Sequence, residues 1–148
     1  MSGNQQPCLL GAIEQHLQSA TPLTIASLGG MAALMAQAQS LVESPYLDVL
    51  AEFANSALPD ESADIDKLLL QGFAECQDPC AIRSAADIVI CSPPLRQRIS
   101  TRLASVLEQR IESQTTKKQE LIAAYALEAL FRLALASSIS KFIPLKIL

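Results

Sequence analysis

The sequence predicts an all-α fold in which about seven or eight helices share one domain over residues 1–148. Apolar residues recur every three to four positions through most of the chain, which is the spacing of a helix face. No segment shows the strict alternation of a half-buried strand, and no Asn-Gly or Asp-Gly pair offers a hairpin turn. Half of the residues are apolar but only 4% are aromatic, so we expect a core of Leu, Ile and Ala, as in closely packed helices.

Proline and small polar residues mark the expected helix starts in order along the chain. A Ser, Thr or Asp side chain can cap the free amide groups of a first turn, and proline at the next position sacrifices no hydrogen bond. The predicted starts are Pro7, Thr21-Pro22, Ser44-Pro45, Asp60 or Ser62, Asp78-Pro79, Ser92-Pro93, and Thr116 with its capping-box partner Gln119. The adjacent Gly29 and Gly30 predict a break, because two glycines cost about 2 kcal/mol of helix propensity against alanine.

Three of the expected helices carry an apolar stripe that predicts a buried face. The stripes are Leu47, Leu50, Phe53, Ala54 and Ala57; Ile65, Leu68, Leu69, Gly72, Phe73 and Cys76; and Ile82, Ala85, Ala86, Val89 and Ile90.

The segment LIAAYALEALFRLALAS, residues 121–137, reads as a helix in which only Glu128 and Arg132 are charged. Since a surface helix normally keeps a polar face for water, we expect other helices to cover this one on both sides. Glu128 and Arg132 lie four positions apart in the favourable order and are expected to pair. A membrane span is the rival interpretation, but a span needs about 20 apolar residues and each central charge would cost about 2.5–3.5 kcal/mol.

Two stretches resemble the helices of known repeat families. The stretch DPCAIRSAADIVI, residues 78–90, resembles the HEAT-repeat pattern through Asp78, Pro79, Ile82, Arg83, Ala85, Ala86 and Val89. The stretch AAYALEAL, residues 123–130, resembles the third helix of an armadillo repeat. This resemblance implies a right-handed α-solenoid, with a compact helical bundle as the alternative. Armadillo proteins that clamp extended peptides use an Asn of that helix, where this chain has Ala129, so peptide capture of that kind is not expected.

Charge and cysteine content bound the class of protein. The net charge is −4, but residues 1–82 hold ten acids and one base, whereas residues 83–148 hold ten bases and five acids. One end of the molecule is therefore expected to be acidic and the other basic. Cys8, Cys76, Cys80 and Cys91 lack the spacing of a zinc knuckle or redox pair, and the lone His16 is distant from the last three. We expect reduced cysteines, no metal and no cofactor, and an intracellular protein of the cytoplasm or nucleus without a signal peptide.

The helix PPLRQRISTRLASVLEQRIE, residues 93–112, contains the sharpest candidate site, because Arg96 and Arg110 share an arc with its apolar residues while Arg98 and Arg102 flank it. One interpretation is that Arg96 and Arg110 lay their methylenes on the core and extend the guanidinium to water or a nearby acid. The other is an arginine-lined groove for an acidic partner segment, in which truncating Arg98 and Arg102 weakens binding and leaves melting nearly unchanged. The predicted partner-binding residues are Arg96, Arg98, Arg102, Arg110, Lys117, Phe142 and Leu145.

The function predicted from these patterns is protein binding rather than catalysis. No nucleophile with an orienting acid can be identified beside His16. A pI of about 4.9 and the scarcity of aromatic residues argue against nucleic acid. The apolar chain end SKFIPLKIL would dock on its own domain, begin another layer of a longer helical array, or enter a partner. We therefore predict a non-enzymatic scaffold or adaptor that binds another protein or further repeats, with a self-associating assembly subunit or chaperone as the alternative.

Overall fold

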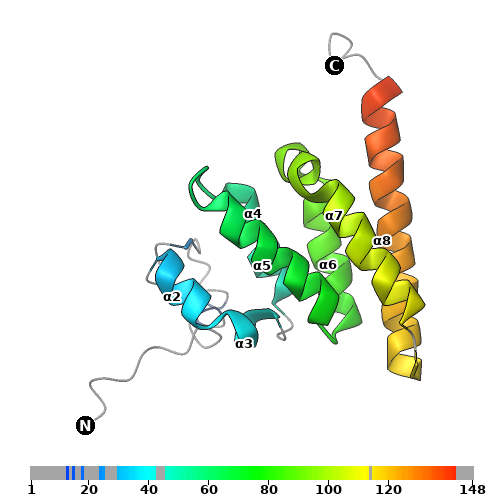
Figure 1. Cartoon of the computed structure of the whole chain (residues 1–148), viewed down its shortest axis with the longest axis horizontal. Helices are drawn as coiled ribbons and strands as arrows, with labels where there is room; N and C mark the ends of the chain where they lie inside the picture. Colours follow the sequence, from blue (N-terminus) through cyan, green and yellow to red (C-terminus); the bar gives the residue numbers. More distant parts are fainter. Residues whose placement is uncertain are drawn as a thin grey trace.

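The computed structural model of the chain describes residues 30–42, 46–113 and 115–142, together with Ile13, Gln15, Gln18, Thr24 and Ile25. Its helices, shown in Figure 1, are α2 (Met31–Ala36), α3 (Ala38–Val42), α4 (Leu47–Ser56), α5 (Ser62–Glu75), α6 (Pro79–Ile90), α7 (Pro93–Glu112) and α8 (Lys117–Phe142). None of the described residues lies in a β-strand, so the all-α prediction is confirmed. The predicted starts at Pro7, Thr21-Pro22 and Ser44-Pro45 fall outside the described residues.

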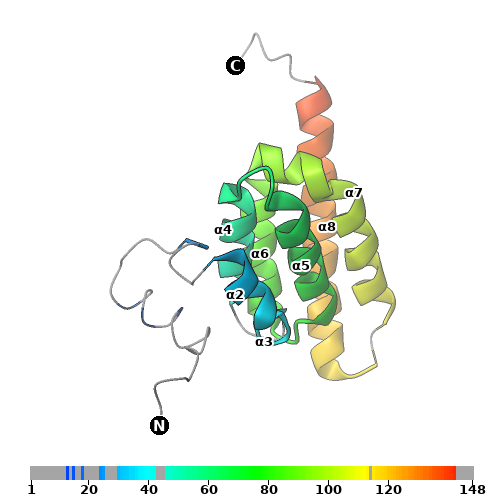
Figure 2. The same ribbon diagram turned by 60° about the vertical axis from the view of Figure 1, so that its left-hand side comes forward.

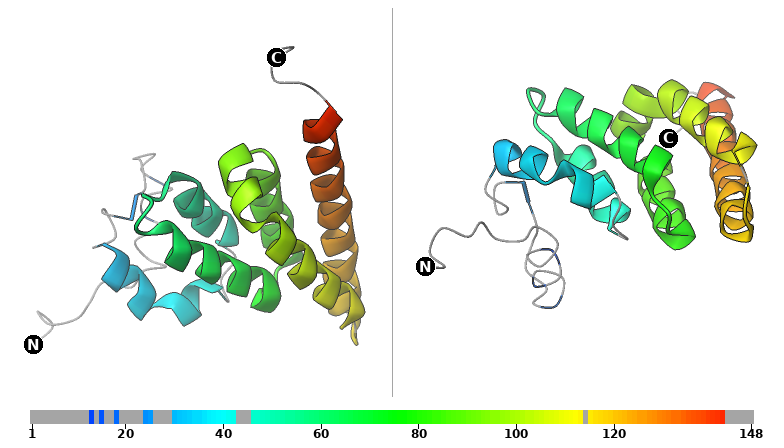
Figure 3. Two further views of the ribbon diagram at one scale, coloured as in Figure 1. Left: turned by 45° about the horizontal axis from the view of Figure 1, so that its top comes forward. Right: turned by 60° about the horizontal axis from the view of Figure 1, so that its bottom comes forward.

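The helices succeed one another across the molecule in chain order, and alternate helices form two rows (Figures 1 and 2). In one row α3 packs on α5 and α5 on α7, and in the other α4 packs on α6 and α6 on α8. Between the rows α4 packs against α5, α6 against α7, and α7 against α8. Figure 3 shows the same succession from two other directions. Helix α8 thus stands at the end of its row, with neighbours on its α6 and α7 sides.

Local side-chain chemistry sets several helix starts. The Asp78 side chain accepts hydrogen bonds from the backbone N–H groups of Cys80 (3.0 Å) and Ala81 (3.3 Å), as predicted for the cap of α6. Helix α7 begins at Pro93 as predicted, although the Ser92 side chain makes no capping bond. At the start of α8, Thr116 Oγ1 accepts from the Gln119 N–H at 3.1 Å.

The capping box predicted at the start of α8 is only half formed. The Gln119 side chain donates to Gln77 Oε1 at 2.7 Å, and so joins the start of α8 to the segment between α5 and α6. The side chain of a box residue would otherwise reach back to the N–H of the capping residue. Gln119 therefore ties two parts of the chain together that are far apart in sequence.

Two glycines have a defined structural role. Gly30 has φ 95°, a left-handed conformation that favours glycine, and α2 begins at the next residue, as the predicted break requires. Gly72 lies where α5 crosses α4, and a Cβ atom there would overlap the side chain of Leu47. The absence of a side chain at Gly72 therefore allows the two helices to approach closely.

The described core is built from aliphatic residues with Phe53 and Phe73, as the composition predicts. The three predicted stripes on α4, α5 and α6 are buried, except that Ala57, just beyond α4, is half-buried. On α7, Leu95, Ile99, Leu103 and Leu107 are buried. Helical periodicity therefore identified the inner face of each of these helices correctly.

The described residues do not provide the cover on both sides that was predicted for residues 121–137. Helix α8 buries Ile122, Ala126 and Leu133 against α6 and α7, but its opposite side is open among the described residues. On that side Leu121 is 48% exposed, Leu127 56%, Phe131 70% and Leu135 51%. The physical reason is position, because α8 ends its row and no described helix lies beyond it.

Candidate interaction surface on the last helical hairpin

The arginines of α7 hold the ends of earlier helices. Arg98 forms a two-pronged ion pair with the buried Asp66 of α5, with Nε donating to Oδ2 and Nη2 to Oδ1, each at 2.8 Å. Arg98 Nη2 also donates to the carbonyl of Ala54, near the end of α4, at 2.9 Å. The hydrogen bonds that Arg98 donates to Asp66 raise the pKa of Arg98 above its ordinary value. This guanidinium therefore joins α7 to both α4 and α5.

Arg96 and Arg110 act in the same way on α6 and α5. Arg96 Nη1 donates to the carbonyl of Ile90, the last residue of α6, at 2.6 Å. Arg110 Nη1 donates to the carbonyls of Phe73 (3.0 Å) and Ala74 (2.7 Å), in the last turn of α5. Burial lowers the pKa of Arg110. Carbonyls at helix ends lack partners within the helix and carry partial negative charge, so cations stabilise them.

The predicted site residues therefore differ in their contacts and exposure. Arg96, Arg98 and Arg110 each make internal bonds, and Arg110 extends to backbone carbonyls rather than to water or an acid. Arg102 is exposed and donates to the Arg98 carbonyl at 3.1 Å, and Lys117 is exposed at the start of α8. Their role in partner binding stays a prediction.

The remaining two predicted site residues lie at the end of the chain. Phe142 is the last residue of α8, and its side chain falls outside the described part of the structure, as does the whole of Leu145. Their predicted contact with a partner also stays a prediction.

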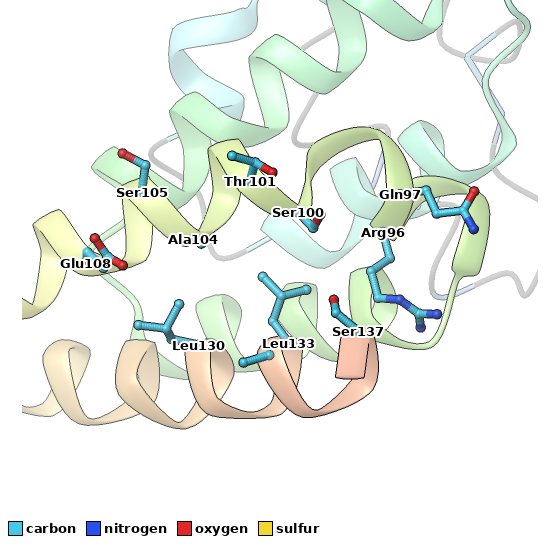
Figure 4. A pocket seen from close by; sticks show the side chains of 11 residues that line it. Arg96, Gln97, Ser100, Thr101, Ala104, Ser105, Glu108, Leu130, Leu133 and Ser137 are labelled. Carbon is cyan, nitrogen blue, oxygen red and sulfur yellow. The ribbon is translucent and has the colours of Figure 1, made fainter. Parts of the chain in front are cut away.

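A groove of about 740 Å³ lies between α7 and α8 (Figure 4). Leu130 and Leu133 of α8 point toward α7 and, with Ala104 and Ala134, provide its apolar lining. Its polar lining comes from Gln97, Ser100, Thr101, Ser105 and Ser137, with Arg96 toward one end and Glu108 toward the other. Apolar lining with a polar rim is typical of a surface that receives a helix or an apolar side chain of a partner.

The exposed leucines and phenylalanine of α8 form a second apolar surface beside this groove. We call Leu121, Leu127, Phe131 and Leu135 the α8 stripe. The earlier members of the same row differ, because α4 exposes Glu52, Asn55 and Ser56, and α6 exposes Arg83 and Ser84 together with Cys80. The solvent side therefore changes from polar on α4 and α6 to apolar on α8.

Ion pairs hold the two central charges of α8 on the α6 side. Arg83 of α6 pairs with Glu128 at 3.1 Å, and Arg132 pairs with Asp87 of α6. The Arg83 guanidinium also lies over the Tyr125 ring, 5.6 Å from its centroid. The predicted pairing of Glu128 with Arg132 is therefore wrong, since each has a partner on the neighbouring helix. The α8 stripe is left without charge.

Sequence reasoning missed the groove lining and the α8 stripe as a surface. The available signal was the scarcity of charge in residues 121–137, which predicts burial but does not say by what. The arrangement of α7 and α8 supplied the rest.

Metal ligands, thiols and membrane-spanning helices were also sought among the described residues. They contain no group of three or more His, Cys, Asp or Glu side chains that could hold a metal ion. Cys76, Cys80 and Cys91 are free thiols, and burial raises the pKa of Cys76. No helix within the described ranges is both long enough and apolar enough to span a bilayer. His16 lies outside the described residues.

Comparison of the chain with models of known protein families, with curated proteins and with solved structures finds no significant match. The armadillo and HEAT resemblance therefore stays a prediction from the two short stretches that suggest it.

Proposed function

We propose that this protein is a non-enzymatic scaffold of α-solenoid type that binds a partner protein through its last helical hairpin, α7–α8. The solenoid part of the proposal is supported by the next-but-one packing of helices α3 to α8, which form two rows. Stacked repeats have this pattern of neighbours, and each interior helix is then covered within its row.

The observation that carries the proposal is the contrast between the terminal helix and its row. Helices α4 and α6 present mainly polar residues to solvent, whereas α8 presents Leu121, Leu127, Phe131 and Leu135. Large exposed apolar patches on a folded domain typically mark sites of protein contact. The groove between α7 and α8 adds an apolar lining next to that patch.

The groove favours an amphipathic helix of another protein as the bound element. Such a helix would place residues spaced three and four apart on the lining formed by Leu130 and Leu133. Because Arg96 and Glu108 stand toward opposite ends, a complementary helix carries an acid at one end and a base at the other.

The free thiols of Cys76, Cys80 and Cys91 support an intracellular location as part of the proposal. Two of them, Cys80 and Cys91, are exposed and would be open to oxidation in an oxidising compartment.

The test is site-specific photo-crosslinking in cell extract. A photoreactive amino acid replaces Ser105 in the groove lining, and the matched control replaces Ser84, which is exposed on α6. We expect one discrete protein adduct from position 105 and none of that mass from position 84. Introducing Leu130→Asp in the position 105 variant is expected to abolish the adduct. Equal labelling at both positions, or no adduct at 105, contradicts the proposal.

A further inference from the structure

The α8 stripe is an apolar surface without charge, so whatever covers it is apolar too. Its only charged neighbours at its centre, Glu128 and Arg132, are held toward α6 by their ion pairs with Arg83 and Asp87. A polar partner would find no hydrogen-bonding groups there and would lose its hydrogen bonds to water. The occupant is therefore an apolar surface.

The order of residues along this face is self-complementary. Ala124, Leu127, Phe131 and Ala134 are exposed and follow one another at spacings of three, four and three residues, the spacing of core positions in a coiled coil. Ala124 and Ala134 lie five positions on either side of Ala129, and Leu127 and Phe131 lie two positions on either side. Two antiparallel copies related by a two-fold axis at the level of Ala129 would set alanine against alanine and leucine against phenylalanine.

We propose that the α8 stripe is the interface of a symmetric dimer, in which the α8 helices of two copies of this chain pack antiparallel. The exposed fractions of the four large residues correspond to on the order of 450 Å² of apolar surface on each copy. Two such stripes with their flanking alanines reach about 1,000 Å², the lower bound for a specific interface. A second copy supplies Leu127 and Phe131 in the matching order, whereas Leu121 and Leu135 flank these pairs.

This interface adjoins the groove, because Ala134 borders both, and it goes beyond the proposed function by assigning the α8 stripe to a second copy and leaving the groove to the partner. Leu130, which lines the groove, and Phe131, at the centre of the stripe, are consecutive and therefore point about 100° apart around the helix. A dimer built on the stripe presents two grooves, one on each copy. It would raise the avidity of the scaffold for a partner with two binding segments.

The dimer is tested by sedimentation equilibrium and light scattering of the full chain at a series of concentrations. We expect a species of twice the 15.9 kDa chain mass. Phe131→Glu should weaken the dimer by more than about 100-fold, because it puts a charge into the centre of both halves of the interface. Ser84→Glu, on an exposed residue of α6, is the matched control and should leave the dimer unchanged. Leu127→Lys is the second variant, and helicity by circular dichroism checks that each one folds.

Orientation is tested in a chain whose Cys8, Cys80 and Cys91 are replaced by Ser. Under oxidation, a mixture of Ala124→Cys and Ala134→Cys chains should form a mixed disulfide. Ala124→Cys alone should not link, because its two copies would lie about 15 Å apart.

Four results overturn the proposal: a parent chain that stays monomeric, a dimer that survives Phe131→Glu and Leu127→Lys, open-ended aggregates in place of a dimer, or a disulfide between two copies of residue 124. Crosslinking at Ser105 is repeated on the Phe131→Glu chain. If the Ser105 adduct still forms when no dimer is present, the proposed function stands independently of the dimer. The two proposals can therefore fail separately.

Discussion

Replacing Arg98 by alanine is predicted to destabilise the fold rather than only to weaken partner binding. The change removes a two-pronged bond to the buried Asp66 and a bond to the Ala54 carbonyl. Sequence reasoning expected melting to be nearly unchanged, because it could not see these partners. The structure makes Arg98 the link between three helices.

The expected loss can be worked from the exposure of the pair. Breaking a fully buried ion pair by removing one partner costs about 3–5 kcal/mol. The Arg98 side chain is 32% exposed and that of Asp66 4% exposed, so water relieves part of this penalty and about 2–3 kcal/mol remains. For a chain of this size that corresponds to a fall in melting temperature of about 5–10 °C.

The assay is thermal and urea unfolding followed by far-ultraviolet circular dichroism. Arg102→Ala is the matched control, because Arg102 is exposed and makes one bond to the Arg98 carbonyl, so its loss should stay within about 0.5 kcal/mol. Arg98→Lys keeps the charge but loses the two-pronged geometry, so its melting temperature should lie between those of Arg98→Ala and Arg102→Ala. Equal melting temperatures for Arg98→Ala and Arg102→Ala would refute this reasoning.

Three further predictions use the same unfolding measurements. Arg110→Ala removes the donor to the Phe73 and Ala74 carbonyls and should lower the free energy of unfolding by about 2 kcal/mol, whereas unchanged stability would contradict its role at the end of α5. Asp78→Ala should cost about 1 kcal/mol through loss of the α6 cap, and Asp78→Asn much less; equal losses would argue against capping. Burial raises the pKa of Cys76, so the unfolded chain loses its thiol proton at lower pH than the folded one. The contribution of Cys76 to the free energy of unfolding should therefore be complete below about pH 8.5 and should be lost as the pH rises further. Cys76→Ala should reduce this dependence of stability on pH. An unaltered dependence would show that other groups cause it.

Local chemistry explains which parts of the fold could be predicted from sequence. Asp78-Pro79 and Thr116 act on amide groups two or three residues away, so the sequence alone contains both partners. The stripe from Ile65 to Cys76 was readable for a similar reason, since helical spacing fixes which residues share a face.

The remaining features depend on contacts between distant residues. Asp66 is 32 positions from Arg98, and nothing in the local pattern distinguishes it from the solvated acids near the start of α5. Glu128 and Arg132 have ideal spacing for a pair within one helix, yet both bond to α6, where Arg83 and Asp87 present opposite charges. The scarcity of charge on α8 predicted that the helix is covered. It did not indicate whether the covering surface belongs to the same chain or to another molecule.

The central claim is that the outer face of α8 is left open by the described part of the chain and is covered in the working assembly. Hydroxyl-radical footprinting read by mass spectrometry tests this directly at Phe131, with Phe73 as the buried reference. The account predicts that Phe131 is strongly labelled in the dilute purified chain and protected at high concentration or in cell extract, while Phe73 stays unlabelled throughout. A Phe131 that is unreactive in the dilute chain, or equally reactive under all conditions, would contradict it.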